Sequence, residues 1–323
     1  MELQFLNLLD HPELVHGATM VSADENGIFF RRMEEDLAKI YDTGEHRHIR
    51  INCPTGVRIA FATNSPCVAL ELAYFAEARP IYTMDVIVDG GEIQTYGPGE
   101  TSPEFSALIE LPGNGLHQIE IHLPHLVEVR LHALAVAAGA AVKPIRCARK
   151  ILFFGDSITQ GMTTSSPARA FAPRLASMLQ ADFRNVSVGG AVFEDDFGKL
   201  ALRYPWETVF LAFGANDFVT NVPLDVLDQR VRKILRSLCR RRSARHLMLT
   251  PIPLLAKPGK NDNGDTLQDF RDVIAAAAKE FPVQLIDGTS VIPADDRFYA
   301  DGCHPNDMGA EAMAQHLLPY FQA

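Results

Sequence analysis

The hydrophobic pattern divides the chain into two parts with different periods. From Arg47 to about residue 136, short runs such as HIRIN, VRIAFAT and MDVIVDG alternate apolar and polar residues. Many short strands at even spacing, separated by turns such as Asp89-Gly90-Gly91, predict an antiparallel β-sandwich. Residues 1–45 are weakly patterned, and the charged stretch Arg31–Lys39 fits a short helix as well as an extended edge strand.

After residue 150 apolar runs alternate with amphipathic stretches of helical period. The strand candidates are ILFF, FRNVSV, TVFLAF, HLMLTPIP and VQLID, and the helix candidates cover residues 168–180, 224–241, 267–280 and 306–320. This order predicts a parallel sheet with helices on both faces. The small-residue and proline-containing stretch 137–150 is the expected linker. The chain is therefore expected to hold a β-sandwich domain, residues 1–143, and an α/β domain, residues 144–323.

Charge and composition exclude several classes of partner. The formal net charge is −10 and the pI is near 5.5, which argues against nucleic acid or an anionic membrane as the main partner. The basic run 236–245 is interpreted as the solvated end of a helix. The N-terminal residues lack the features of a secretory signal, and no window approaches the ~20 apolar residues of a membrane span. We expect a soluble, cytoplasmic protein, or a secreted one if a signal was removed.

The cysteines and histidines favour no metal centre. Five cysteines without C-x-x-C spacing predict reduced thiols. Eight of the eleven histidines occur by residue 132, and several (His48, His122 and His132) alternate with apolar residues, as outward positions of a strand would. A sandwich domain could bind carbohydrate or substrate, but the single tryptophan, Trp206, lies outside this part of the chain.

Four segments of the second part are expected to meet at one edge of the sheet. Ser157 directly follows the ILFF strand in ILFFGDSITQG, and the other segments are Gly189-Gly190, Asn216 and the run DGCHP. Open α/β sheets bind their ligands at the carboxyl ends of the strands. Each segment alone could be a turn or a helix cap. Together they supply a nucleophile, a base, an orienting carboxylate and oxyanion donors, as acyl transfer requires.

The catalytic roles follow from residue type and position. Ser157 is the candidate nucleophile and His304 the candidate base, because His246 and His316 fall in a predicted strand and a predicted helix. Asp301, three residues before His304, is close enough to fix the imidazole tautomer.

The oxyanion hole is expected to combine donors from three loops. These donors are the backbone N–H groups of Ser157 and Gly190 and the side-chain amide of Asn216. Asp217 is expected to turn away, since a carboxylate would repel an oxyanion.

Residues near these motifs could shape the pocket, although packing or surface charge is the alternative for each. The candidates are Met162, Phe193, Phe218, Arg169 and Arg203, with the loop Leu254–Asp265 as a rim.

The four segments together resemble the four blocks of the SGNH (GDSL) hydrolase superfamily: Gly155-Asp156-Ser157-Ile158, Gly190, Gly214-Ala215-Asn216-Asp217 and Asp301-Gly302-Cys303-His304-Pro305. The resemblance covers roughly residues 150–323. It implies a flavodoxin-like three-layer α/β/α domain, a Ser-His-Asp triad, and no metal or cofactor. The preceding, jelly-roll-like sandwich resembles the arrangement in carbohydrate esterase family two and in sandwich-bearing SGNH acyltransferases and esterases.

The expected function is that of a serine esterase, a carboxylic ester hydrolase acting through an acyl-enzyme. Its expected substrate is a small-molecule or carbohydrate ester with a small O-acyl group, foremost acetyl. Two alternatives stay open: an acyltransferase that passes the acyl group to an alcohol, and a non-catalytic carbohydrate-binding protein. Acyl and alcohol specificity and oligomeric state do not follow from the sequence.

Overall fold

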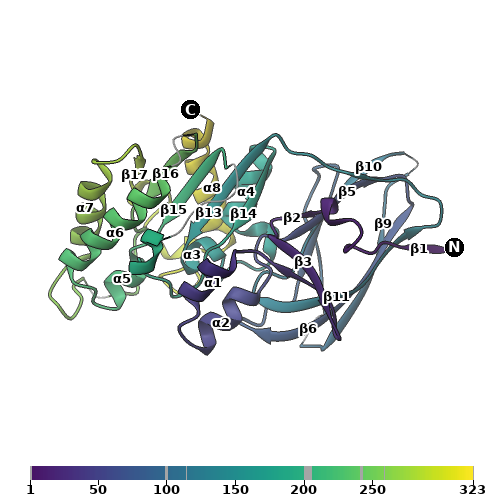
Figure 1. Ribbon diagram of the computed structural model, residues 1–323, viewed down its shortest axis with the longest axis horizontal. Helices are drawn as coiled ribbons and strands as arrows, with labels where there is room; N and C mark the ends of the chain where they lie inside the picture. The colour runs from purple at the N-terminus through teal and green to yellow at the C-terminus, as the bar shows by residue number, and fades with distance from the viewer. Residues whose placement is uncertain are drawn as a thin grey trace.

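The computed structural model describes residues 2–98, 101–113, 115–199, 206–240, 243–257 and 259–322. Two six-stranded antiparallel sheets and one five-stranded parallel sheet form its framework. Figure 1 shows the antiparallel sheets at the right, beside the N-terminus, and the parallel sheet with its helices at the left. The predicted fold, an antiparallel β-sandwich followed by an α/β domain with a parallel sheet, is confirmed.

The two antiparallel sheets enclose the first hydrophobic core. Alternate side chains such as Ile59, Phe61, Leu70 and Ile121 point into this core, which gives the period of two in the sequence. One sheet has the order β3-β4-β11-β6-β9 with β1 added to β11: Met20–Asp24, Gly27–Arg31, Val127–Ala137, Cys67–Glu77, Glu104–Glu110 and Leu3–Phe5. The other has the order β12-β5-β10-β7-β8 with β2 added to β5: Val142–Pro144, Arg58–Thr63, His117–His122, Met84–Val88, Gln94–Tyr96 and Val15–His16.

The parallel sheet has helices on both faces. Its order is β14-β13-β15-β16-β17: Ala181–Asn185, Arg149–Gly155, Thr208–Ala212, Arg245–Leu249 and Gln284–Ile286. Ile151 and Phe153 of β13 face the core shared with α4 (Phe171–Met178) and α8 (Asp307–Gln322). Leu152 and Phe154 face the core shared with α6 (Leu224–Leu238) and α7 (Leu267–Ala278). Burial on both faces explains why the strand is apolar at every position from Ile151 to Phe154.

The predicted helices of this part are all present with shifted ends. Helix α7 begins at a capping box between Thr266 and Asp269. The expected end of α6 at Arg241 lies outside the described residues, and the helix ends at Leu238. Across the described part of the chain, the helices are all too short or too polar to span a membrane.

The stretch Arg31–Lys39, for which the sequence left a helix and an edge strand open, lies mostly in helix α1 (Glu35–Tyr41), and only Arg31 belongs to a strand, β4. Its side chains pack on the second part of the chain: Met33, Leu37 and Tyr41 belong to the core around β13 and α6. The Tyr41 ring meets Phe197 edge-on at 5.5 Å between centroids. The domain division at residue 143 stays a prediction, because residues before it complete a core beyond it.

The strand predicted at HIRIN is wrong. Residues Glu45–Asn52 form helix α2, which lies next to α1 and to strands β6 and β11 of the sandwich (Figure 1). The alternation of Ile49 and Ile51 with polar residues mimicked a strand. Contacts of Arg47 and Arg50 with the second part of the chain, three residues apart and therefore on one helix face, stabilise the helix instead.

Two further expectations concern the histidines and cysteines. His122 lies on β10 but is buried, so its predicted outward position is wrong. Burial, with the positive charge of Arg58 nearby, lowers the pKa of His122 to about 3. His48 lies on helix α2 rather than on a strand, whereas His132 on β11 is exposed. All five cysteines are free thiols, as predicted.

Candidate active site

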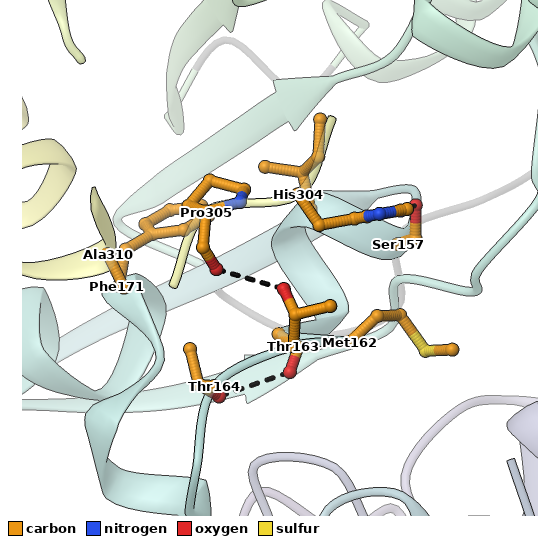
Figure 2. A pocket seen from close by; sticks show the side chains of 10 residues that line it. Ser157, Met162, Thr163, Thr164, Phe171, His304, Pro305 and Ala310 are labelled. Carbon is orange, nitrogen blue, oxygen red and sulfur yellow. Dashed lines mark hydrogen bonds between the residues drawn. The ribbon is translucent and has the colours of Figure 1, made fainter. Parts of the chain in front are cut away.

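Ser157, His304 and Asp301 form a continuous hydrogen-bonded series. Ser157 Oγ lies 2.9 Å from His304 Nε2, and His304 Nδ1 lies 2.8 Å from Asp301 Oδ2. Figure 2 shows the His304 ring directed at the Ser157 hydroxyl. Because a carboxylate only accepts, Nδ1 donates to Asp301 and Nε2 is left to accept the proton of Ser157.

The turn from β13 into α3 (Ser157–Gln160) places the Ser157 hydroxyl at the sheet edge. Asp156 caps this short helix by accepting a hydrogen bond from the N–H of Ile158 at 3.0 Å. At Gly155 a Cβ would lie 2.5 Å from Thr159 Oγ1 and 2.6 Å from the carbonyl of Ala212. No side chain fits there, so glycine is required for the close approach of strand and helix.

The loop Asp301–Pro305 holds His304 by its backbone as well as by its ring. Asp301 Oδ1 accepts from the N–H groups of Cys303 at 3.0 Å and of His304 at 2.8 Å. Partial burial tends to raise the pKa of Asp301, but the hydrogen bonds from His304 and Cys303 outweigh it and lower this pKa below its ordinary value. Asp301 is therefore an ionised orienting group at neutral pH.

Three groups were predicted as oxyanion donors: the N–H groups of Ser157 and Gly190 and the side-chain amide of Asn216. Gly190 has φ +81°, and neither its N–H nor that of Ser157 has a hydrogen-bond partner among the described residues. Asn216, in α5 (Ala215–Val219), donates one amide hydrogen to the carbonyl of Ala191 at 3.0 Å and keeps a second one. This hydrogen bond connects Asn216 to Ala191, the residue directly after Gly190.

Asp217 turns away from this region, as expected. It is fully buried, and both its carboxyl oxygens accept from the N–H of Phe193, at 3.1 and 3.3 Å. Burial raises the pKa of Asp217 to about 7 and that of Asp156 to about 7 as well. Asp156 precedes Ser157 and caps α3, whereas Asp217 follows Asn216 and holds the Phe193 segment; neither carboxyl group joins the triad.

A cavity of about 230 Å³ opens beside the triad. Apolar side chains of α5 and of the loop after β16 line it together with Ser157, Asn216 and His304: Ala215, Val219, Leu254 and Ala256. Lys257 is also at its wall. The predicted rim Leu254–Asp265 thus contributes its first residues to the cavity.

The other pocket candidates are placed differently. Met162 lines a smaller pocket next to Ser157, shown in Figure 2. The pocket role considered for Phe193 and Phe218 is wrong and the packing alternative is confirmed, because both side chains are buried in the core between the sheet and α6. Arg169 lies 3.9 Å from Asp307, and Arg203 is outside the described residues.

Sequence reasoning missed the residues that the first part of the chain adds to this region. Arg47 and Arg50 of α2 donate to the carbonyls of Gly190 and Gly189 at 2.7 and 2.8 Å. Their spacing of three residues is the helical signal that the misassigned strand concealed.

One family of known proteins matches the part of the chain that holds Ser157, Asp301 and His304. Residues 153–312 match the model of the GDSL-like Lipase/Acylhydrolase family. No curated protein sequence matches the chain.

Several solved structures have a similar fold over both the antiparallel sandwich and the domain with the parallel sheet. A salicylyl-acyltransferase, SsfX3, from a tetracycline biosynthetic pathway has a TM-score of 0.80 at 21% identity, covering 94% of this chain and 92% of that one. A family two carbohydrate esterase from Cellvibrio japonicus has a TM-score of 0.70 at 17% identity, covering 99% and 97%. Another from Clostridium thermocellum, in complex with cellohexaose, has a TM-score of 0.67 at 15% identity, covering 95% and 98%.

These identities show a shared fold and leave the substrate open. The family match, which includes the triad residues, supports a hydrolase or an acyl-transfer enzyme. Residues 153–312 of this chain are a GDSL/SGNH lipase-acylhydrolase domain.

Proposed function

We propose that the protein is a serine esterase that hydrolyses small O-acyl esters through an acyl-enzyme. The observation that carries the proposal is the series Ser157–His304–Asp301, with distances of 2.9 and 2.8 Å. A hydroxyl in contact with an imidazole that is itself oriented by a carboxylate is the arrangement that activates a serine nucleophile.

The reaction follows from this geometry. His304 Nε2 takes the proton of Ser157 Oγ as the oxygen bonds to the ester carbonyl carbon, and the carbonyl oxygen becomes the oxyanion. The N–H groups of Ser157 and Gly190 and the Asn216 amide stabilise that charge. His304 then gives its proton to the leaving alcohol, and the C–O bond of the ester breaks. Water repeats the sequence on the acyl-enzyme and releases the acid.

The cavity supports a small acyl group. Its volume of about 230 Å³ is below the ~300–1,000 Å³ of pockets for drug-sized ligands. Val219, Leu254 and Ala256 give it an apolar wall. Acetyl and other short acyl groups fit such a space, and the neighbours named carbohydrate esterases make a sugar the leading candidate for the alcohol.

An acyltransferase is the second candidate function. The neighbour with a TM-score of 0.80 is named an acyltransferase, and the same triad serves both reactions. In a transferase a bound alcohol would attack the acyl-enzyme in place of water. Product analysis with candidate alcohols present separates the two, since only a transferase yields a new ester in preference to free acid.

The test is a panel of acetylated sugars and p-nitrophenyl esters with acyl chains of increasing length, read by released acid or phenol. We expect turnover of the short esters by the wild-type protein and its loss in Ser157→Ala, with unchanged thermal unfolding. A fluorophosphonate should label the wild-type protein at Ser157. Full activity in Ser157→Ala would overturn the proposal. Carbohydrate binding without turnover or labelling would favour the non-catalytic alternative.

A further inference from the structure

Helix α2 of the first part of the chain lies against the glycine turn of the active site. Arg50 Nη1 donates to the carbonyl of Gly189 at 2.8 Å, and Arg47 Nη2 donates to the carbonyl of Gly190 at 2.7 Å. The two arginines lie one helical turn apart, so one face of α2 reaches two consecutive carbonyls. The two hydrogen bonds are nearly equal in length but reach different peptide groups.

That difference decides which arginine acts on the oxyanion hole. The carbonyl of Gly189 belongs to the same peptide group as the N–H of Gly190, the proposed oxyanion donor. The carbonyl of Gly190 shares its peptide group with the N–H of Ala191, which donates to the carbonyl of Val188 at 3.0 Å. Arg50 therefore acts on the donor peptide, whereas Arg47 acts on a peptide whose N–H is already used.

Gln160 fixes the other side of the same segment. Its Oε1 accepts from the N–H of Gly189 at 2.7 Å, and its Nε2 donates to the carbonyl of Arg50 and to Thr55 Oγ1, both at 3.1 Å. The Gln160 side chain is fully buried. The Gly189 N–H and carbonyl are thus both held by groups that also contact α2 or are part of it, which leaves the Gly190 N–H little freedom to rotate.

The positive charge of Arg50 is not balanced by an ion pair among the described residues, so the Gly189–Gly190 peptide is a neighbour that can respond to it. Among the described residues Arg50 forms no ion pair, whereas Arg47 is paired with Glu194 at 2.8 Å. Burial and the nearby positive charges of Arg79 and Arg47 lower the pKa of Arg50. A cation on a carbonyl polarises the peptide and strengthens its N–H as a donor, and hydrogen bonds in series strengthen one another by about 10–30%.

We propose that Arg50 is a positioning residue of the oxyanion hole: its guanidinium, reaching across from the first part of the chain, orients and polarises the Gly189–Gly190 peptide so that the Gly190 N–H donates to the oxyanion. The inference rests on the proposed esterase function. It gives the N-terminal sandwich and its helix α2 a direct part in the chemistry, because the catalytic domain alone would lack the group that sets this donor.

The test compares Arg50→Gln and Arg50→Lys with Arg47→Gln as the matched control. The oxyanion forms only after attack, so Arg50→Gln should lower kcat about tenfold with KM unchanged, less than the ~10²–10³ for removal of a whole donor. Arg50→Lys keeps the charge and should recover part of the loss. Arg47→Gln, which loses a bond of equal length and an ion pair, should change kcat less than about threefold.

Each outcome separates this inference from the proposed function. If the wild-type protein neither turns over an ester nor labels at Ser157, both fail. If it is active and depends on Ser157 but Arg50→Gln retains its kcat, only the role of Arg50 fails. Equal losses in Arg50→Gln and Arg47→Gln, with equal falls in Tm, would reduce the contact to a structural one and also overturn the inference. Should Arg50→Gln not fold, Arg50→Lys carries the test, and an unchanged kcat there overturns it.

Discussion

Arg32, in the first part of the chain, donates from Nη1 to the carbonyl of Asn185 at the end of β14, at 2.7 Å. Its Nε donates to the carbonyl of Cys53 at 2.9 Å and its Nη2 to the carbonyl of Arg50 at 2.7 Å. The side chain is 1% exposed, and burial lowers its pKa to about 10. One buried cation thus joins the carboxyl end of α2, where the helix dipole is negative, to the parallel sheet.

Removal of this cation should destabilise the protein strongly. Arg32→Met removes a charged donor from three carbonyls, of which those of Cys53 and Arg50 keep a second donor in the Thr55 N–H and in Gln160 Nε2. We expect a loss of about 2–4 kcal/mol in the free energy of unfolding. Arg32→Lys keeps the charge with a less suitable donor geometry and should lose less. Urea unfolding of both variants measures the difference. A loss below about 1 kcal/mol in Arg32→Met would show that the contact does not hold the two parts together.

The buried carboxyl of Asp217 should make stability depend on pH. Its pKa is raised from 3.8 to about 7, so between about pH 4 and pH 7 the folded protein binds more protons than the unfolded chain. The free energy of unfolding contributed by this group therefore falls as pH rises through that window and is constant above it. Asp217→Asn keeps an oxygen to accept from Phe193 and does not titrate.

Asp217→Asn should accordingly flatten the profile and raise stability at pH 8 by about 1–3 kcal/mol. Urea unfolding at pH 5, 6, 7 and 8 checks this, with the exposed Asp225→Asn as the control that should leave the slope unchanged. If Asp217→Asn were less stable than the wild-type protein at pH 8 but equally stable at pH 5, the effect of pH would be opposite to the prediction, and the prediction would fail.

Substitution of Gly190 by alanine, compared with the same substitution at Gly139, separates a role in the oxyanion hole from the effect of backbone strain. The φ of Gly190 is +81° and a Cβ there would lie 3.2 Å from Arg50 Nη1. Gly139 has a similar φ of +78° with no atom within 4 Å of its Cβ position. Both glycine-to-alanine changes should cost about 1–2 kcal/mol of stability, but only Gly190→Ala should lose ~10²-fold or more in kcat. Equal activity in the two variants would remove Gly190 from the hole.

The sequence predicts the parts of the site that are local in the chain. Asp301 and His304 are three residues apart, and Ser157 and Asn216 each follow a buried strand, so strand ends and residue types were enough to place them. Arg50 and Gln160 could not be found in this way. Their role depends on the docking of α2 against the glycine turn, and HIRIN has the same alternation as a strand.

The same physical limit explains the weak pattern of residues 31–45. Met33, Leu37 and Tyr41 are buried against a core formed by residues more than a hundred positions later. The apolar residues of so short a helix form too brief a pattern to be recognised from the sequence, because the core that they pack against comes from distant parts of the chain. Long-range packing, rather than local preference, also explains why Phe193 and Phe218 lie in the core although they adjoin catalytic blocks.

Val219 should set the length of acyl chain that the enzyme accepts. It lines the cavity beside Ser157 and Asn216 and is 40% exposed, so a larger side chain there can fill the space without disturbing a core. Val219→Phe should therefore lower kcat/KM for a butyryl ester about tenfold more than for an acetyl ester, because one or two methylenes in an apolar pocket are worth ~1–3 kcal/mol. Val219→Ala should shift the preference toward the longer chain. The measurement is kcat/KM for p-nitrophenyl acetate and butyrate with each variant, and parallel changes for the two esters would place the acyl group elsewhere.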